Sequence, residues 1–182
     1  VYKRQAFTIG EIMKLCKSYR STFEITDFSQ KIQTNHELEP IIRHGEPPAI
    51  LRFEDVKQEI LGIFSIISSF KKSGYTSLGI VCKTETQARE LSKSLRVHTG
   101  DIHFLSNQSS AFMKGIIVTS SHMAKGLEFD EVIVPYVNAK NYNSAIDKSM
   151  LYVAVTRAMH RLTLTYNGRP SEFIPASSDQ NF

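Results

Sequence analysis

Short apolar runs alternate along the chain with longer segments in which apolar and polar residues recur at helical spacing. The clearest helical segments are residues 56–70 and the stretch that follows Thr84 and Gln87, which have the spacing of a capping box. Strands that alternate with helices predict an α/β fold in which a mostly parallel sheet carries helices on both faces. The runs that resemble buried strands are 49–53, 78–82, 102–105, 114–119, 131–135 and 162–165.

Polar residues also predict where two other helices begin. Ser21 and Glu24 have the spacing of a capping box, so a helix is expected to start there and to end near Thr34. Ser144 can cap a further helix, and the apolar pattern extends that helix to Ala158.

Composition and charge limit the class of protein rather than its function. The 182 residues are 41% hydrophobic and 22% charged, which fits one folded domain with a core. The net charge of +4 allows a polyanionic partner without requiring one. Two distant cysteines suggest reduced thiols and a cytoplasmic location, and no apolar run has the length of a membrane span. We expect one domain over residues 1–166 and a loose tail over 167–182, both cut from a longer protein because the chain does not start with Met.

A polar block that contains a glycine follows the strand expected to end at Thr119. It is His-Met-Ala-Lys-Gly-Leu-Glu-Phe-Asp, residues 122–130. Loops at the carboxyl ends of parallel strands line binding crevices, and Gly126 would let the backbone approach a ligand closely. Lys125 offers charge to phosphates, and Glu128 can accept hydrogen bonds from a ribose hydroxyl. On these features alone, a solvated turn between two strands is the favoured interpretation of the block.

Two other segments place charge beside an apolar stretch. Residues 150–155 are apolar nearly all round, which is typical of a buried helix, and Arg157 follows them. Taken alone, Arg157 is explained as a cap for the carboxyl end of that helix. Residues 17–22 include Tyr19 and Arg20, next to the predicted start of another helix.

In chain order, residues 17–22, 122–130 and 152–158 resemble motifs IV, V and VI of the UvrD/Rep class of superfamily 1 helicases. The nine residues of the middle block carry the most specific part of this resemblance. It implies that the fold is a RecA-like domain and that the chain supplies half of an ATP site in a nucleic-acid motor.

The resemblance also implies roles for single residues at the nucleotide. Tyr19 would stack on the adenine, and Glu128, with Gly126 nearby, would hold the ribose. Arg20 and Arg157 would act as arginine fingers toward the γ-phosphate, a task for which a permanently charged, forked guanidinium is suited.

For nucleic acid, the resemblance implies that His122 faces single-stranded DNA, with Thr119 and Lys125 as further contacts. One departure concerns residues 120 and 121, which are both Ser where the UvrD branch usually carries an apolar residue before the histidine. Both DNA and RNA stay open as partners on the sequence alone.

The phosphate-binding loop of such motors is absent from this sequence. No Gly is followed by Lys, so no Gly-x-x-x-x-Gly-Lys-Ser/Thr motif occurs. Asp130 and Glu131 precede an apolar strand instead of following one, so they are not the acidic pair that holds Mg²⁺. The histidines show no metal-site spacing. The resemblance therefore assigns the phosphate loop and Mg²⁺ to an N-terminal RecA-like domain of the same protein, and this chain alone should be inactive as an ATP hydrolase.

The residues around motif IV, and the short stretch of chain between motifs IV and V, are most similar to the helicase IV/HelD-type branch. Two functions fit this resemblance. One is an ATP-dependent DNA helicase or translocase. The other is the ATPase of a HelD-type factor that binds RNA polymerase, recycles it and does not unwind DNA. A third interpretation, an α/β domain with an unrelated ligand, must treat three motifs in family order as coincidence.

Overall fold

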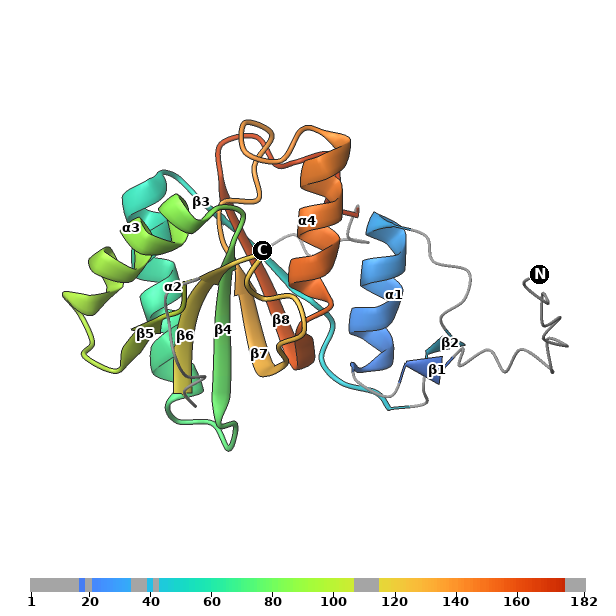
Figure 1. Cartoon of the computed structure of the whole chain (residues 1–182), viewed down its shortest axis with the longest axis horizontal. Coiled ribbons are helices and arrows are strands. Elements are labelled where there is room, and N and C mark those ends of the chain that lie inside the picture. Colours follow the sequence, from blue (N-terminus) through green and yellow to red (C-terminus); the bar gives the residue numbers. More distant parts are fainter. Residues whose placement is uncertain (1–16, 19–20, 34–38, 41–42, 107–114, 176–182) are drawn as a thin grey trace, which may run out of the picture.

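Six parallel strands form the main sheet of the computed structural model, which describes residues 17–18, 21–33, 39–40, 43–106 and 115–175. The strand order is β3-β8-β7-β4-β6-β5 (Figure 1). This confirms the α/β fold with a parallel sheet that the apolar pattern predicted. The strands are β3 (Ala49–Phe53), β4 (Ser77–Cys82), β5 (Ile102–Phe104), β6 (Gly115–Ser120), β7 (Phe129–Val134) and β8 (Ala158–Asn167). A separate parallel pair consists of β1 (Lys17–Ser18) and β2 (Glu39–Pro40).

Two helices cover each face of the main sheet. The first pair, α1 (Phe23–Ile32) and α4 (Ala145–Val155), packs on one hydrophobic cluster. The second pair, α2 (Val56–Phe70) and α3 (Glu85–Arg96), packs on the other (Figure 1). Apolar positions at helical spacing therefore face the sheet on both sides, as the sequence pattern predicted.

Strand β4 shows why its sequence is an unbroken apolar run. Ile80 and Cys82 belong to the cluster under α2 and α3, whereas Val81 belongs to the cluster under α1 and α4. The ring of Phe129 lies directly over Gly79. Any larger residue at this position would bring its Cβ into contact with that ring. A strand buried on both faces has no position for a polar residue.

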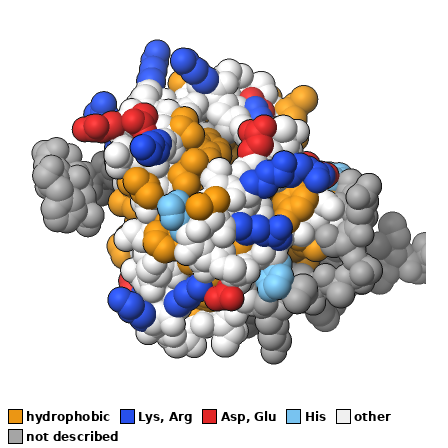
Figure 2. All heavy atoms as spheres, turned by 90° about the vertical axis from the view of Figure 1, so that its left-hand side faces the viewer, with side chains coloured by type: hydrophobic (Ala, Val, Ile, Leu, Met, Phe, Trp, Pro, Cys, Tyr) orange, Lys and Arg blue, Asp and Glu red, His pale blue; other side chains and the backbone are white. Residues whose placement is uncertain are grey.

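Charged side chains on the face that carries α3 and β5 are mixed in sign (Figure 2). Arg89 pairs with Glu85 within α3, and Lys71 pairs with Asp101, each at 2.8 Å. Such pairs are ordinary solvated charges of a protein surface.

The start of α1 differs from the capping box expected from Ser21 and Glu24. The helix is preceded by Thr22 and ends at Ile32, two residues before the expected Thr34. Ser21 donates its hydroxyl hydrogen to the carbonyl oxygen of Ala158 at 2.6 Å instead of capping the helix. Tertiary partners have therefore replaced the local hydrogen bonds that the spacing suggested.

The last predicted helix is shorter than expected. Ser144 and Asp147 form a capping box at the start of α4, but the helix ends at Val155 and not at Ala158. Ala158 instead begins β8, where it lies opposite Phe129 of β7. The parallel pairing of these strands stops the helix before its apolar pattern runs out.

The residues after β8 fold back on the domain. Pro170 forms an isolated antiparallel bridge with Asn138, and Ser171 is buried. The Ser171 hydroxyl donates to the carbonyl oxygen of Tyr142 at 2.8 Å. This contact differs from the loose tail expected from Asn167 onward; residues 176–182 lie outside the described part of the chain. The division at residue 166 stays a prediction.

Candidate nucleotide and nucleic-acid sites

The two ends of the 122–130 block lie at opposite edges of the sheet. We call the edge where the strands begin the amino edge and the edge where they end the carboxyl edge. Ser121, just after β6, donates its backbone N–H to the carbonyl oxygen of Cys82 at 2.8 Å, so it lies at the carboxyl edge. Residues 121–128 then return along the face covered by α1 and α4 to Phe129, the first residue of β7.

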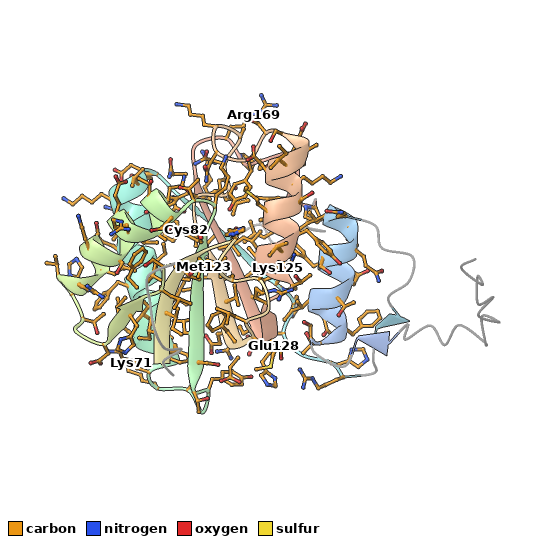
Figure 3. All side chains as sticks on the ribbon, viewed as in Figure 1. Lys71, Cys82, Met123, Lys125, Glu128 and Arg169 are labelled. Carbon is orange, nitrogen blue, oxygen red and sulfur yellow. The ribbon has the colours of Figure 1, made fainter. Side chains whose placement is uncertain are left out.

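This return path has an apolar underside. Ala124 is fully buried in the cluster under α1 and α4, and Leu127 packs against the same cluster. Glu128 is exposed and lies near the start of β7, at the opposite end of the sheet from Arg169 (Figure 3). The expectation that the whole block forms one loop at the carboxyl edge is therefore wrong, because the segment crosses the sheet between its polar ends.

Arg157 and Glu128 come together at the amino edge. The carbonyl oxygen of Arg157 accepts a hydrogen bond from the backbone N–H of Phe129 at 3.0 Å. Its Nη1 donates to the carbonyl oxygen of Leu127 at 3.3 Å. Both neighbours of Glu128 in the chain are thus bound to Arg157, so the two residues belong to one local site.

Two further contacts of the Arg157 side chain are with the end of α4. Its Nε donates to the carbonyl oxygen of Val153 at 3.1 Å, and Nη2 donates to Oγ1 of Thr156 at 3.1 Å. A cation at this position also complements the negative end of the helix dipole. The capping role that the sequence allowed is therefore present in the structure.

The third predicted segment reaches the same edge. The bond from Ser21 to the Ala158 carbonyl joins the start of α1 to the residue that follows Arg157. Tyr19 and Arg20 lie outside the described residues, so their places at the site stay predictions. The structure brings together Glu128, Arg157 and the residue next to Arg20 in the chain.

Gly126 and Lys125 lie between the two edges, and both are exposed. Gly126 has a φ of +88°, and a Cβ at this position would meet no atom within 4 Å. The backbone conformation, which other residues rarely adopt, is thus the reason that the structure gives for a glycine here. A close approach to a nucleotide stays a prediction.

At the carboxyl edge, the predicted nucleic-acid residues separate into exposed and buried ones. His122 is exposed. Thr119 is fully buried, and its hydroxyl donates to the carbonyl oxygen of Leu105 at 3.1 Å. A direct contact of Thr119 with nucleic acid is not available in this conformation, because the side chain is fully buried beside the residue that follows β5.

Comparisons with known proteins place this geometry in a family. Residues 115–165, which include Glu128 and Arg157, match the family described as UvrD-like helicase C-terminal domain. The C-terminal domain of a possible DNA helicase from Lactobacillus plantarum WCFS1 is similar over 87% of this chain and 92% of that chain, with 30% identity and a TM-score of 0.74. The chain belongs to the UvrD-like helicase C-terminal domain family.

A second solved structure is more distant. The arterivirus nonstructural protein 10, a helicase solved with DNA, is similar over 66% of this chain and 28% of that chain, with 14% identity and a TM-score of 0.46. A likeness at this level carries no inference for this chain. Comparison with curated protein sequences found no significant match.

This UvrD-like domain also contains a polar cluster that the sequence did not reveal. Lys83, the first residue after β4, pairs with Asp147 at 2.8 Å and donates to the carbonyl oxygen of Asn141. Its Nζ lies 5.6 Å from the centre of the buried Tyr142 ring. The only local signal was a lysine that directly follows an apolar strand. The cluster ties the start of α4 to the carboxyl end of β4.

A buried carboxylate joins the ends of other elements at the same edge. Glu59 is fully buried and accepts hydrogen bonds from the Tyr136 backbone N–H, from Thr165 Oγ1 and from Asn167 Nδ2, at 2.8, 2.6 and 2.6 Å. Such bonds satisfy a buried carboxylate without a cation. Among the described residues, no cluster of side chains suited to hold a metal ion is found, and no helix is long and apolar enough to cross a membrane.

We expect Asp147→Asn to reduce the free energy of unfolding by about 2 kcal/mol at pH 7. Partial burial raises the pKa of Asp147, but hydrogen bonds from Lys83, Asn143 and Ser144 lower it to about 2 overall. Because the folded-state pKa lies below the unfolded value, this stabilisation is present above about pH 4 and is lost as pH falls toward 2. Urea unfolding of the wild type and of Asp147→Asn, at pH 7 and at pH 3, measures this difference in stability.

Asp27→Asn is the control for Asp147→Asn. Asp27 pairs with Lys31 on the exposed side of α1 at 2.7 Å, with its side chain 46% exposed. Its removal should change stability by less than about 0.5 kcal/mol. An Asp147→Asn effect of the same size at both pH values would show that the ion pair contributes nothing to folding.

Proposed function

We propose that this domain is the C-terminal motor domain of an ATP-dependent DNA helicase or translocase. It would supply Arg157 and Glu128, together with Tyr19 and Arg20, to an ATP site completed by an N-terminal RecA-like domain of the same protein. The observation that carries the proposal is the meeting of Arg157, Glu128 and the Ser21 segment at the amino edge. Membership of the UvrD-like family supports it.

The side chains at this edge have the chemistry that a nucleotide requires. Glu128 is an exposed carboxylate, which can accept hydrogen bonds from ribose hydroxyls. Arg157 offers a fixed positive charge whose described partners are carbonyl and hydroxyl oxygens. A phosphate oxygen is a stronger acceptor than these, so the guanidinium can exchange some of them for a phosphate.

Within the proposal, the residues of this chain bind and orient, and they stabilise charge. Glu128 would fix the ribose, and Arg157 would stabilise negative charge that develops on the transferring phosphoryl group. Bound ATP would supply that phosphoryl group. Mg²⁺ and the phosphate loop would come from the N-terminal domain, since this sequence contains no Gly-x-x-x-x-Gly-Lys-Ser/Thr motif.

The Glu128 role has a direct test in the protein that contains both RecA-like domains. Glu128→Ala should raise the KM for ATP by about 10-fold or more, because hydrogen bonds to a charged group are worth about 1.5–3 kcal/mol. The same variant should bind 2′,3′-dideoxy-ATP as the wild type does, since that analogue has no ribose hydroxyls to lose. If Glu128→Ala lost the same affinity for ATP and for 2′,3′-dideoxy-ATP, Glu128 would not contact the ribose hydroxyls.

The nucleic-acid part of the proposal concerns the carboxyl edge. His122 is exposed where the crossing segment begins, and Lys125 is exposed further along it. A single strand of DNA bound at His122 would lie at the opposite edge from the nucleotide. The segment 121–128 and α4 both connect these edges, so they are the elements through which binding at one edge can affect the other.

The HelD-type alternative would use the same ATP site for a different task. There the partner would be RNA polymerase, and ATP turnover would release polymerase from nucleic acid. The resemblance of residues 17–28 to that branch supports this alternative. Strand displacement by the intact protein on a tailed duplex would favour the helicase, whereas polymerase release without displacement would favour the remodelling factor.

A further inference from the structure

A three-residue ion cluster lies at the amino edge outside the proposed ATP contacts. Arg161 of β8 donates from Nη1 to Oε1 of the buried Glu131 at 2.8 Å. Its Nε and Nη2 bind both carboxylate oxygens of Glu46, at 2.9 and 2.8 Å. The planar guanidinium is suited to such a two-sided contact, which a lysine could not reproduce. The cluster attaches residues 43–48 to the sheet.

The same segment is attached to the sheet a second time. Arg43 donates from Nη2 to the carbonyl oxygen of Met159 at 2.8 Å. Arg161 and Met159 are both in β8, close to Arg157 in the chain. Residues 43–48 are therefore held against the strand that begins directly after the proposed arginine finger.

On its other side, this segment holds the start of α1. Glu24 accepts hydrogen bonds from Nδ1 of His44 and from the backbone N–H of Gly45, each at 2.8 Å. The backbone N–H of Phe23 donates to the carbonyl oxygen of Arg43 at 2.8 Å. A Cβ on Gly45 would lie 2.6 Å from Thr22 Cγ2, so the segment and the helix start are in close contact.

We propose that Arg161 and Glu24 are positioning residues for the motif that precedes α1. Through residues 43–48, they set the place of residues 21–24 relative to Arg157, and residues 21–24 continue directly from Tyr19 and Arg20. Neither residue touches the nucleotide in this proposal, which rests on the proposed function. The structure assigns this role through six hydrogen bonds on two sides of one short segment.

The alternative is that the cluster serves only general stability. The Arg161–Glu131 pair is a poor source of net stability, because the cost of removing the buried Glu131 from water offsets the attraction, and the Arg161–Glu46 pair is too exposed to add much. Such pairs are better at selecting one arrangement among several. The orientation of an arginine finger needs such a selection, since an error of about 1 Å in a catalytic group can cost about 100-fold in rate.

The test uses the protein that contains both RecA-like domains, with two variants at opposite ends of the link. Arg161→Met removes the cluster, and Glu24→Gln removes the charge that holds His44 and Gly45. Each should lower kcat by about 10-fold or more, with a smaller change in the KM for ATP. Because both act through residues 43–48, the double variant should be little worse than the more impaired single variant.

A local measurement separates positioning from general loss of stability. Hydrogen exchange at the Phe23 amide should accelerate in both variants, whereas exchange at the Ile80 amide in β4 should stay as in the wild type. Lys31→Met is the matched control, because Lys31 lies on the exposed side of α1 and pairs only with Asp27 among the described residues. It should change neither exchange nor turnover.

Each outcome has one meaning. Lower kcat with faster exchange at Phe23 alone supports the positioning role. Faster exchange at Phe23 with unchanged kcat overturns it, and so does unchanged exchange. Arg161→Met could unfold because the buried Glu131 has lost its cation. In that case kcat and hydrogen exchange at Phe23 in Glu24→Gln decide whether the positioning role is correct. Arg157→Ala, measured in parallel, tests the proposed function itself: a loss of turnover there, with none in Arg161→Met or Glu24→Gln, overturns only the positioning role.

Discussion

Replacing Arg157 by Ala in the protein with both motor domains should lower ATP turnover by about 10³-fold or more, the magnitude typical of an arginine finger. The reason is the loss of a fixed positive charge beside Glu128 at the amino edge. Substrate binding should suffer less than kcat, because the charge of the phosphoryl group changes most during transfer. Steady-state ATP hydrolysis measures both parameters.

Arg157→Ala also removes a helix cap, so the two roles must be separated. Loss of the side-chain bonds to Val153, Leu127 and Thr156 should cost about 1–3 kcal/mol of stability, which does not unfold a typical domain. Arg157→Lys keeps the charge without the forked geometry and should remain well below wild-type turnover. Arg52→Ala, at an exposed position of β3, serves as the control. Unchanged hydrolysis in folded Arg157→Ala would rule out the arginine-finger role.

Replacing Phe129 by Ala should lower the free energy of unfolding by about 3–5 kcal/mol. Its ring is fully buried in the cluster under α1 and α4, and it covers Gly79 on the central strand. Removal would leave a cavity that neighbouring strands cannot close, since close-packed interiors relax only partly. Urea denaturation of the chain provides the measurement. Phe23→Ala, where the ring is 40% exposed, should cost far less.

Gly79 offers an internal check on the Phe129 prediction. Gly79→Ala alone should be destabilising, because its Cβ would meet the Phe129 ring. In the Phe129→Ala background the same change should be tolerated, so the two effects should not add. Additive effects would show that the ring and the glycine are not in contact in solution.

The sheet and its four helices could be predicted from local sequence, for identifiable reasons. Residues 78–82 form an unbroken apolar run, which only a strand buried on both faces explains, and they lie in β4. The side chains of Thr84 and Gln87 each accept a hydrogen bond from the other residue's backbone N–H, so the start of α3 needed no distant partner. Local rules succeed where all partners of a residue are close in the chain.

The same rules fail where a distant partner competes. Ser21 and Glu24 have the spacing of a capping box, but the Ser21 hydroxyl binds Ala158, 137 positions away. Glu24 likewise binds His44 and Gly45. The side chains were identified as notable, but their partners could be found only in the folded chain.

The candidate site shows the same division. The residue types and order of the motifs pointed to Glu128 and Arg157, and the structure places them at one edge. The sequence could not show that residues 121–128 cross the sheet, because a polar stretch with a glycine after a strand also describes a local turn. Nor could it show that Thr119 is enclosed, since a threonine at a strand end is often exposed.

The crossing segment has little spare length. Ser121 is bound to Cys82 at one end, Phe129 is bound to Arg157 at the other, and Ala124 is buried between them. An ordinary surface loop can accommodate an inserted or deleted residue by changing its path. In residues 121–128, which are fixed at both ends and in the middle, such a change would move Glu128 away from Arg157. The length of residues 122–128 is therefore part of what keeps Glu128 beside Arg157.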